Sequence, residues 1–140
     1  MKNIENSNFM RLLGVWKTTG TIKSDQDNLE LIGIDSYELI LNGNCILHKA
    51  DVKMGNDRSE TLEIIKLDDS SDKAIMHYFN TEGEEGKMLS SIIKNEFKIE
   101  GDSLKFAGTI NEDNSKINGK WFMKDNNDQW SDFIDLYLEK

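Results

Sequence analysis

Residues 31–54 read LIGIDSYELILNGNCILHKADVKM, and this stretch contains the pattern that decides the fold. Two short segments of alternating character, Leu31–Leu41 and Cys45–Met54, are separated by the turn residues Asn42-Gly43-Asn44. Asn and Gly accept the positive φ that tight hairpin turns require, so this combination is a strong hairpin signal. The stretch therefore predicts two antiparallel strands joined by a tight turn.

The same pattern continues on both sides of this hairpin. Clusters of Gly, Asn, Asp and Ser separate about ten short segments, which we expect to be strands. Besides the two already named, they are Leu13–Lys23, Ser59–Leu67, Lys73–Asn80, Lys87–Ile93, Asn95–Glu100, Ser103–Asn111, Lys116–Lys124 and Gln129–Leu138. Parallel neighbours need a crossover of about a dozen residues. The connections are shorter than that, so we expect antiparallel strands.

A long antiparallel meander either leaves two exposed edges or closes on itself, and closure removes the edges. The chain contains no proline, so ladder pairing is uninterrupted. Only the N-terminus has a helical pattern: Ser7 can cap a short turn that places Phe9, Leu12 and Leu13 on one face, and Gly14 ends it. We therefore predict an all-β fold with a single domain over residues 1–140: an up-and-down antiparallel β-barrel whose N-terminal helical turn covers one mouth.

Composition and charge exclude several classes of partner. The chain carries 26 acidic and 17 basic side chains, a net charge of −9, which a nucleic acid or an anionic membrane repels. No apolar run approaches the roughly 20 residues of a membrane-spanning helix. The first residues lack the apolar stretch of a secretory signal, and the single Cys45 suits a reducing compartment. We therefore expect a cytoplasmic protein that binds neither nucleic acid nor membranes.

Alternation along each strand indicates which side chains face the barrel interior. In two predicted strands the more apolar stripe contains a histidine, His48 in Cys45–Met54 and His77 in Lys73–Asn80. We therefore expect both imidazoles to face inward. Together with three aromatic side chains they form the predicted ligand-binding wall of the lumen: His48, His77, Tyr37, Tyr78 and Trp130.

Several motifs, in their order along the chain, resemble those of a known group of barrels. Leu13-Gly14-Val15-Trp16, after the apolar turn, is similar to the Gly-x-Trp signature of the lipocalins and the wider calycin superfamily. The other motifs are Ser36-Tyr37-Glu38, Leu41-Asn42-Gly43, Met76-His77-Tyr78-Phe79-Asn80, Gly119-Lys120-Trp121 and Trp130. Together they resemble an uncharacterised bacterial lipocalin-like family, a domain of unknown function, over nearly the whole chain. This resemblance implies a lipocalin-like barrel in which Gly14, Trp16 and Trp121 are structural signature residues.

The sequence departs from related barrels at two points. Lipocalins have an arginine near the last strands that packs over the signature Trp, whereas this chain has no arginine after Arg58. A lysine such as Lys120 is expected to replace it, unless the closure differs. Nitrobindins, haem-carrying relatives of similar size, ligate iron through a histidine near the C-terminus, but no histidine follows His77 here. We therefore predict no haem and no other cofactor.

A metal site and a cysteine nucleophile are not expected either. One predicted strand separates His48 from His77, and Glu60 or Glu63 on that strand faces them only in a suitable register. A stable metal site needs three or four ligands, and no spacing such as HExxH supplies them. Cys45 has no local base, because His48 lies three positions on and therefore on the opposite face of the strand.

Three functions remain open from the sequence. The preferred one is a binding module whose lumen holds a small, largely apolar or amphipathic molecule. The second is a small enzyme, of isomerase, decarboxylase or hydrolase type, that uses lumen histidines. The third is an interaction protein with a filled barrel, a monomer or homodimer, that presents Phe122, Phe133 and Tyr137 on its outer face.

Overall fold

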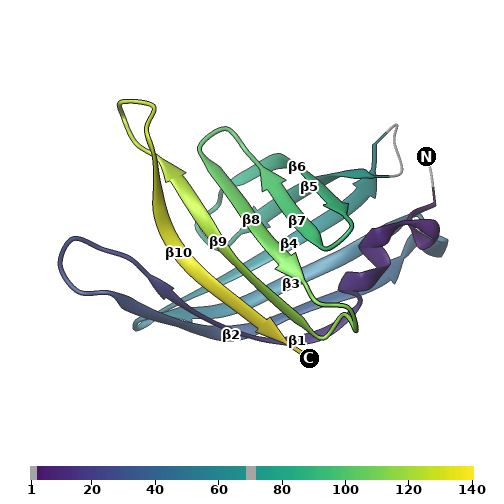
Figure 1. Ribbon diagram of the computed structural model, residues 1–140, viewed down its shortest axis with the longest axis horizontal. Coiled ribbons are helices and arrows are strands. Elements are labelled where there is room, and N and C mark those ends of the chain that lie inside the picture. The colour runs from purple at the N-terminus through teal and green to yellow at the C-terminus, as the bar shows by residue number, and fades with distance from the viewer. Residues whose placement is uncertain (1–2, 69–71) are drawn as a thin grey trace.

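The computed structural model describes residues 3–68 and 72–140, and its strands close into one antiparallel barrel (Figure 1). The strands follow the chain order around the barrel, and β1 pairs with β10 to close it. They are β1 (Gly14–Ile22), β2 (Leu29–Ile40), β3 (Cys45–Met54), β4 (Asp57–Leu67), β5 (Lys73–Asn80), β6 (Glu85–Ile93), β7 (Glu96–Glu100), β8 (Leu104–Ile110), β9 (Lys116–Lys124) and β10 (Trp130–Glu139). The predicted up-and-down barrel of about ten strands is confirmed.

The turn between β2 and β3 has the backbone that its residues predict. Leu41, Asn42 and Gly43 have φ angles of 53°, 58° and 80° and form the short 3₁₀ turn η3 (Leu41–Gly43). Asn and Gly adopt this left-handed region at little cost, whereas Leu41 is held there by the turn around it. The result is a tight reversal that sets the register of β2 against β3, with Ile40 opposite Cys45.

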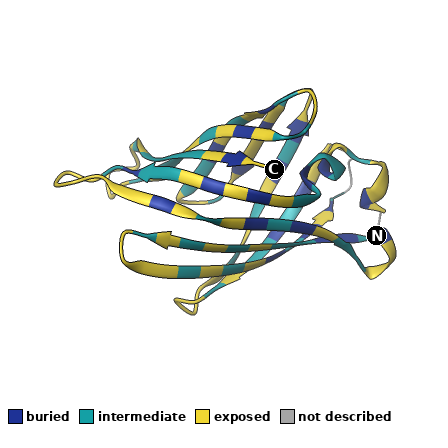
Figure 2. Ribbon diagram, turned by 90° about the horizontal axis from the view of Figure 1, so that it is seen from below, coloured by how far each residue is buried: buried dark blue, intermediate teal, exposed yellow. Residues whose placement is uncertain are grey.

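Buried and exposed residues alternate along the strands, as the side chains point in turn into and out of the barrel (Figure 2). At the end where β1 begins, the inward side chains form the apolar core of the barrel. This core includes Trp16, Ile46, Ile65, Met76, Ile92, Phe97, Ile110 and Ile117. We call this end the closed end and the opposite end the open end.

Two short 3₁₀ helices, η1 (Ile4–Asn6) and η2 (Asn8–Leu12), form a plug at the closed end. Ser7 caps η2, because its hydroxyl oxygen accepts a hydrogen bond from the backbone N–H of Phe9 at 3.2 Å. Phe9 and Leu12, both in η2, are completely buried and pack against the barrel core. The predicted helical turn over one mouth is confirmed. None of the helices in the described residues is long and apolar enough to span a membrane.

Arg11 fastens this plug to two turns of the closed end. Its Nε donates to Oδ1 of Asn114 at 2.5 Å, and its guanidinium NH groups donate to the carbonyl oxygens of Lys94 and Asn111 at 2.5 and 3.1 Å. A further bond, of 2.9 Å, reaches Oδ1 of Asn95. One side chain thereby joins the plug to the β6–β7 and β8–β9 turns.

The signature Trp16 lies beneath the plug and is completely buried. Its indole Nε1 donates a hydrogen bond of 2.8 Å to the carbonyl oxygen of Leu12. The ammonium of Lys140 lies 4.7 Å from the centroid of the indole ring. Lys140 therefore takes the place over the signature Trp that we expected for Lys120.

Lys120 cannot reach Trp16 because it lies on the outer face of β9. Its Nζ is 3.3 Å from Oδ2 of Asp132 and 3.5 Å from Oδ1 of Asp135. Lys23 makes matching contacts of 3.1 and 3.4 Å with the same two carboxylates. The expected role of Lys120 is wrong; this lysine instead belongs to an outer charged cluster of Lys23, Lys120, Asp132 and Asp135 on β9, β10 and the end of β1.

Candidate binding site in the barrel lumen

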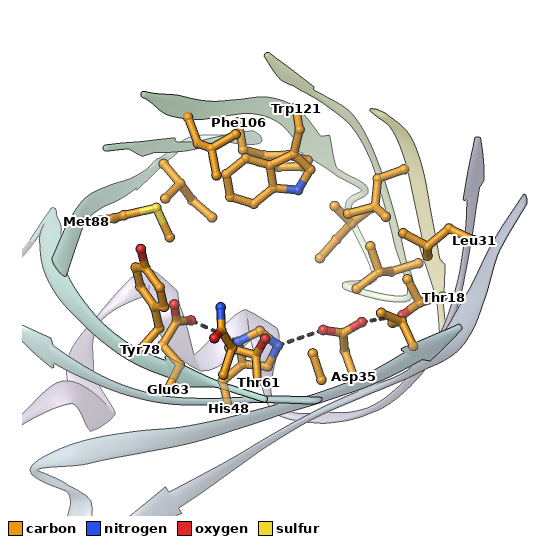
Figure 3. A pocket seen from close by; sticks show the side chains of 18 of the residues that line it. Thr18, Leu31, Asp35, His48, Thr61, Glu63, Tyr78, Met88, Phe106 and Trp121 are labelled. Carbon is orange, nitrogen blue, oxygen red and sulfur yellow. Dashed lines mark hydrogen bonds and ion pairs between the residues drawn. The ribbon is translucent and has the colours of Figure 1, made fainter. Parts of the chain in front are cut away.

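A cavity of about 400 Å³ occupies the open half of the barrel (Figure 3). Glu84 and Ser103 lie in its lining and belong to the β5–β6 and β7–β8 turns of the open end, so the cavity opens there. Its apolar lining includes Leu31, Val52, Met88, Phe106, Trp121 and Leu136, and its polar lining includes Thr18, Asp35, His48, Thr61, Glu63 and Tyr78. The lumen therefore has an apolar wall and a polar wall.

The polar wall is built around His48 on β3. Strand register places Asp35 of β2 and Glu63 of β4 on either side of it. The Nε2 atom of His48 lies 2.7 Å from Oδ1 of Asp35, and Nδ1 lies 2.9 Å from Oε1 of Glu63. Thr18 on β1 donates its hydroxyl hydrogen to Oδ2 of Asp35. Side chains from four consecutive strands of the barrel wall thus form one hydrogen-bonded chain, which we call the His48 network.

Tyr37 lies directly opposite His48 in the register of β2 and β3, and its ring supports the imidazole. The two rings are stacked, with centroids 4.1 Å apart and planes inclined by 6°. Tyr37 is only 7% exposed, so the ring of His48 rests on a buried aromatic face. Stacking fixes the plane of the imidazole while the two carboxylates fix its direction.

The His48 network holds its proton firmly. Burial by itself lowers the pKa of His48, but the hydrogen bonds and negative charges of Asp35 and Glu63 outweigh burial and raise this pKa to about 9. The imidazole is therefore a cation at neutral pH and donates an N–H to each carboxylate. Burial, together with the charges of Asp35 and Glu63, raises the pKa of the Tyr37 hydroxyl well above its ordinary value.

Three residues of the predicted wall line this cavity. His48, Tyr37 and Tyr78 face it from β3, β2 and β5, and Glu63 lies directly opposite both His48 and Tyr78 in the register of β4. Trp121, which the resemblance marked as a structural residue, also lies in the lining. That any of them contacts a ligand stays a prediction.

The expected inward position of His77 is wrong. His77 lies on the outer face of β5, where its Nε2 is 3.3 Å from Oε2 of Glu85 and its side chain is 38% exposed. The inward stripe of this strand is instead Ala74, Met76 and Tyr78. The stripe that contains His77 is only slightly more apolar than the other, so hydrophobicity did not decide the side; pairing with the buried side chains of β4 does.

The expected lumen position of Trp130 is also wrong. A β-bulge between Asp132 and Ile134 changes the register of β10 against β9. Beyond the bulge the alternation is reversed, so Trp130 lies on the outer face. There the ammonium group of Lys105 lies 4.3 Å from the centroid of the Trp130 indole, and that of Lys124 lies 5.5 Å from it.

The sequence interpretation did not identify Asp35 or Thr18. The sequence contained a signal for both, because side chains two positions apart on a strand point to the same face. Asp35 lies two positions from Tyr37, which was expected inside, and Thr18 lies two positions from the signature Trp16. Glu63 was considered for a metal site that depended on register. The observed register brings Glu63 to His48, whereas Glu60 lies outside and pairs with Arg58 at 2.6 Å.

The histidines do not suit the ligation of haem iron. Both ring nitrogens of His48 are engaged with carboxylates, so neither is directed at the lumen, and His77 lies outside the barrel. Across residues 3–68 and 72–140, no group of three His, Cys, Asp or Glu side chains is arranged to hold a metal ion.

Fold and site together define the class of protein: a lipocalin-like barrel of ten antiparallel strands, plugged at one end, with a cavity in its lumen. The chain is similar to the crystal structure of Rv2717c from M. tuberculosis, with 10% sequence identity and a TM-score of 0.73, over 93% of this chain and 92% of that one. It is also similar to the S-type phycobiliprotein lyase CPES from Guillardia theta, with 9% identity and a TM-score of 0.56, over 94% and 88%. At these identities the likeness shows the fold alone.

The similarity is visible in structure and not in sequence. No protein-family model matches the chain, and no curated protein matches it. Function must therefore be argued from the site itself.

Proposed function

We propose that this protein binds a small, largely apolar molecule in the lumen of its barrel. The observation that carries the proposal is the cavity of about 400 Å³, which combines an apolar wall with the buried His48 network. Pockets for small molecules have this character, since apolar area supplies affinity and a few fixed polar groups supply orientation. The amount of apolar lining suits an amphipathic ligand whose polar end meets the network.

The fold by itself does not choose between binding and catalysis. One barrel of this fold is named a phycobiliprotein lyase, so the architecture is compatible with more than one kind of activity. The choice depends on whether the lumen holds a group that can give or take a proton at a bound molecule.

Acid–base catalysis by His48 is not favoured by the geometry of the network. A general base or acid must reach the reacting atom through a hydrogen bond. Both nitrogens of His48 are directed at Asp35 and Glu63, at 2.7 and 2.9 Å, instead of at the cavity. The raised pKa also keeps the imidazole protonated at neutral pH, which removes it as a base. These features disfavour an enzyme that uses the lumen histidine, and they support a binding role for the His48 network.

An interaction protein with a filled barrel is also less well supported. The lumen contains a cavity, and the proposed outer patch is interrupted. Tyr137 pairs with Asn118 and Phe122 pairs with Asp132, so Lys120 and Asp135 of the charged cluster lie between the two aromatic rings. This arrangement does not give the continuous apolar area expected of a stable protein interface.

The test is native mass spectrometry of the protein purified without denaturation from the cells that make it. Two variants make the test specific. Ala50→Phe adds a ring to a residue that lines the cavity, and Ala107→Phe adds the same ring to an exposed residue on the outer face of β8. Circular dichroism checks that both variants fold.

We expect a small-molecule adduct on the wild-type protein and on Ala107→Phe. In Ala50→Phe we expect the adduct to fall at least about tenfold, a loss of about 1.4 kcal/mol of binding free energy. An adduct that survives unchanged in Ala50→Phe lies outside the lumen and overturns the proposal. A wild-type protein that carries no adduct and takes up none of the apolar probes described below overturns it as well.

A further inference from the structure

The charged groups that line the lumen are predominantly acidic. Among the described lining residues, the carboxylates are Asp35, Glu63 and Glu84, and the basic group is the imidazole of His48. No lysine or arginine belongs to the lining that the structure describes. The lining contains three carboxylates and one imidazolium, so the cavity carries net negative charge even when His48 is protonated.

Glu63 has a carboxylate oxygen left for a ligand. Its Oε1 accepts a hydrogen bond from His48, and among the described residues no hydrogen bond reaches Oε2. The side chain of Glu63 is only 6% exposed, so water cannot fully hydrate this oxygen. Figure 3 shows the carboxylate of Glu63 beside the ring of Tyr78, facing the lumen. A carboxylate oxygen that faces a cavity with little water is a strong acceptor for a donor with positive charge.

The opposite wall is aromatic. Phe106 and Trp121 lie across the cavity from Glu63 and His48 (Figure 3), with ring centroids 5.3 Å apart. Phe97 packs against Phe106 at 5.5 Å and belongs to the same wall. Aromatic faces attract cations, and the attraction is larger where water is excluded. Both walls of the lumen therefore favour a ligand with positive charge.

We propose that the ligand is an amine or ammonium compound: an apolar body with a positively charged nitrogen that lies against Glu63, between the carboxylates and the aromatic wall. This inference rests on the proposed function, and it names the class of ligand. A carboxylate ligand, such as a fatty acid anion, is disfavoured because it meets like charges and no lysine or arginine. Glu84 at the open end attracts the cation toward the cavity.

Three probes of equal chain length separate charge from apolar binding: decylamine, decanol and decanoate. Affinities are measured at neutral pH by isothermal titration calorimetry and by the fluorescence of Trp121, with Trp121→Phe to assign the signal. We expect decylamine to bind about tenfold more tightly than decanol, and decanoate to bind most weakly. The readout is the ratio of the decylamine and decanol affinities.

Three variants exchange a carboxylate for an amide of the same shape. Glu63→Gln and Glu84→Gln change the lumen, and we expect each to lower the decylamine-to-decanol ratio severalfold. Glu84 is exposed, so this variant keeps the test valid if Glu63→Gln unfolds the protein. Glu85→Gln is the matched control, because Glu85 lies outside the lumen with a side chain that is 64% exposed, and it should leave the ratio unchanged.

Failure of this inference is distinguishable from failure of the proposed function. If decanol and decanoate bind as tightly as decylamine, or if both lumen variants keep the wild-type ratio, the ligand class is wrong while lumen binding stands. If none of the three probes binds, the ligand class is overturned, and if the purified wild-type protein also carries no small-molecule adduct, the proposed function is overturned with it.

Discussion

His48 and Glu63 face each other across β3 and β4 inside the barrel, with Nδ1 of the imidazole 2.9 Å from Oε1 of the carboxylate. Asp35 holds the other nitrogen at 2.7 Å, so one imidazolium joins two buried carboxylates. Without that proton, two carboxylates of like charge would remain close together in a site with little water. The stability of the barrel is therefore linked to the protonation of His48.

We predict that stability falls as pH rises above neutrality. The pKa of His48 is about 9 in the folded protein and 6.5 in the unfolded chain, so the folded state binds this proton more tightly. The stabilisation is fully present below about pH 6.5 and is lost as pH rises through about 9. Over this interval the free energy of unfolding should decrease by about 3 kcal/mol. Urea denaturation at several pH values measures it.

The control for this prediction is His48→Gln, which removes the titrating group. This variant should be less stable than the wild type at neutral pH, and the decrease between the two pKa values should be largely absent. The prediction is contradicted if the free energy of unfolding of the wild type does not change with pH over this interval. It is also contradicted if this free energy changes with pH in the same way in the wild type and in His48→Gln.

A second prediction concerns the carboxylates that hold the proton. Asp35→Asn and Glu63→Gln each remove one of the two negative charges that raise the pKa of His48, while burial continues to lower it. This pKa should therefore fall from about 9 toward its ordinary value of 6.5. An NMR titration of the imidazole Cε1–H signal measures this pKa. Glu85→Gln, on the outer face, should leave the His48 titration unchanged. Equal titrations in all three variants would show that the carboxylates do not hold the proton.

The plug gives a third prediction, based on the two arginines of the chain. The guanidinium of Arg11 forms hydrogen bonds to two turns, and Arg11→Lys puts a single ammonium in its place. This variant should lower the free energy of unfolding by about 2 kcal/mol. Arg58→Lys is the matched control: the side chain of Arg58 is 63% exposed, and we expect little change. Similar losses in both variants would mean that the plug does not depend on Arg11.

A fourth prediction compares two tryptophans in urea denaturation. Trp16→Phe leaves the carbonyl of Leu12 without its donor and leaves space in the core, which should cost about 2 kcal/mol. Trp130→Phe changes a half-buried ring on the outer face, and its cost should stay under about 1 kcal/mol. The reverse order would place Trp130, and not Trp16, in the core.

Local turn chemistry explains why the architecture could be predicted from the sequence. Each strand ends at a cluster such as Asn42-Gly43-Asn44 whose residues favour reversal, and this requirement does not depend on the rest of the fold. The Ser7 cap and the apolar face of Phe9 and Leu12 are equally local, and both are present in η2. Strand limits shifted slightly, since β2 begins at Leu29 and not at Leu31.

The site was only partly predictable. Whether a side chain points into or out of the barrel depends on contacts between residues that are distant in sequence. His77 and Tyr78 are adjacent and lie on stripes of similar apolarity, so only the register of β4 shows which of them faces inward. Trp130 lies outside because of the bulge before Ile134, and alternation alone does not predict a bulge. Asp35 was overlooked because a lone carboxylate on an inward stripe is unusual until His48 is placed beside it.

The plug held by Arg11 has a consequence for the movement of molecules through the barrel. Among the described residues, side chains fill the closed end, and the cavity opens at the end near Glu84 and Ser103, so the barrel is a cup and not a tube. A ligand must enter and leave the cavity through the same opening. A second ligand therefore cannot push the first one out from the opposite end. Exchange of cargo should therefore proceed at the rate at which the resident molecule departs, whatever the concentration of its replacement.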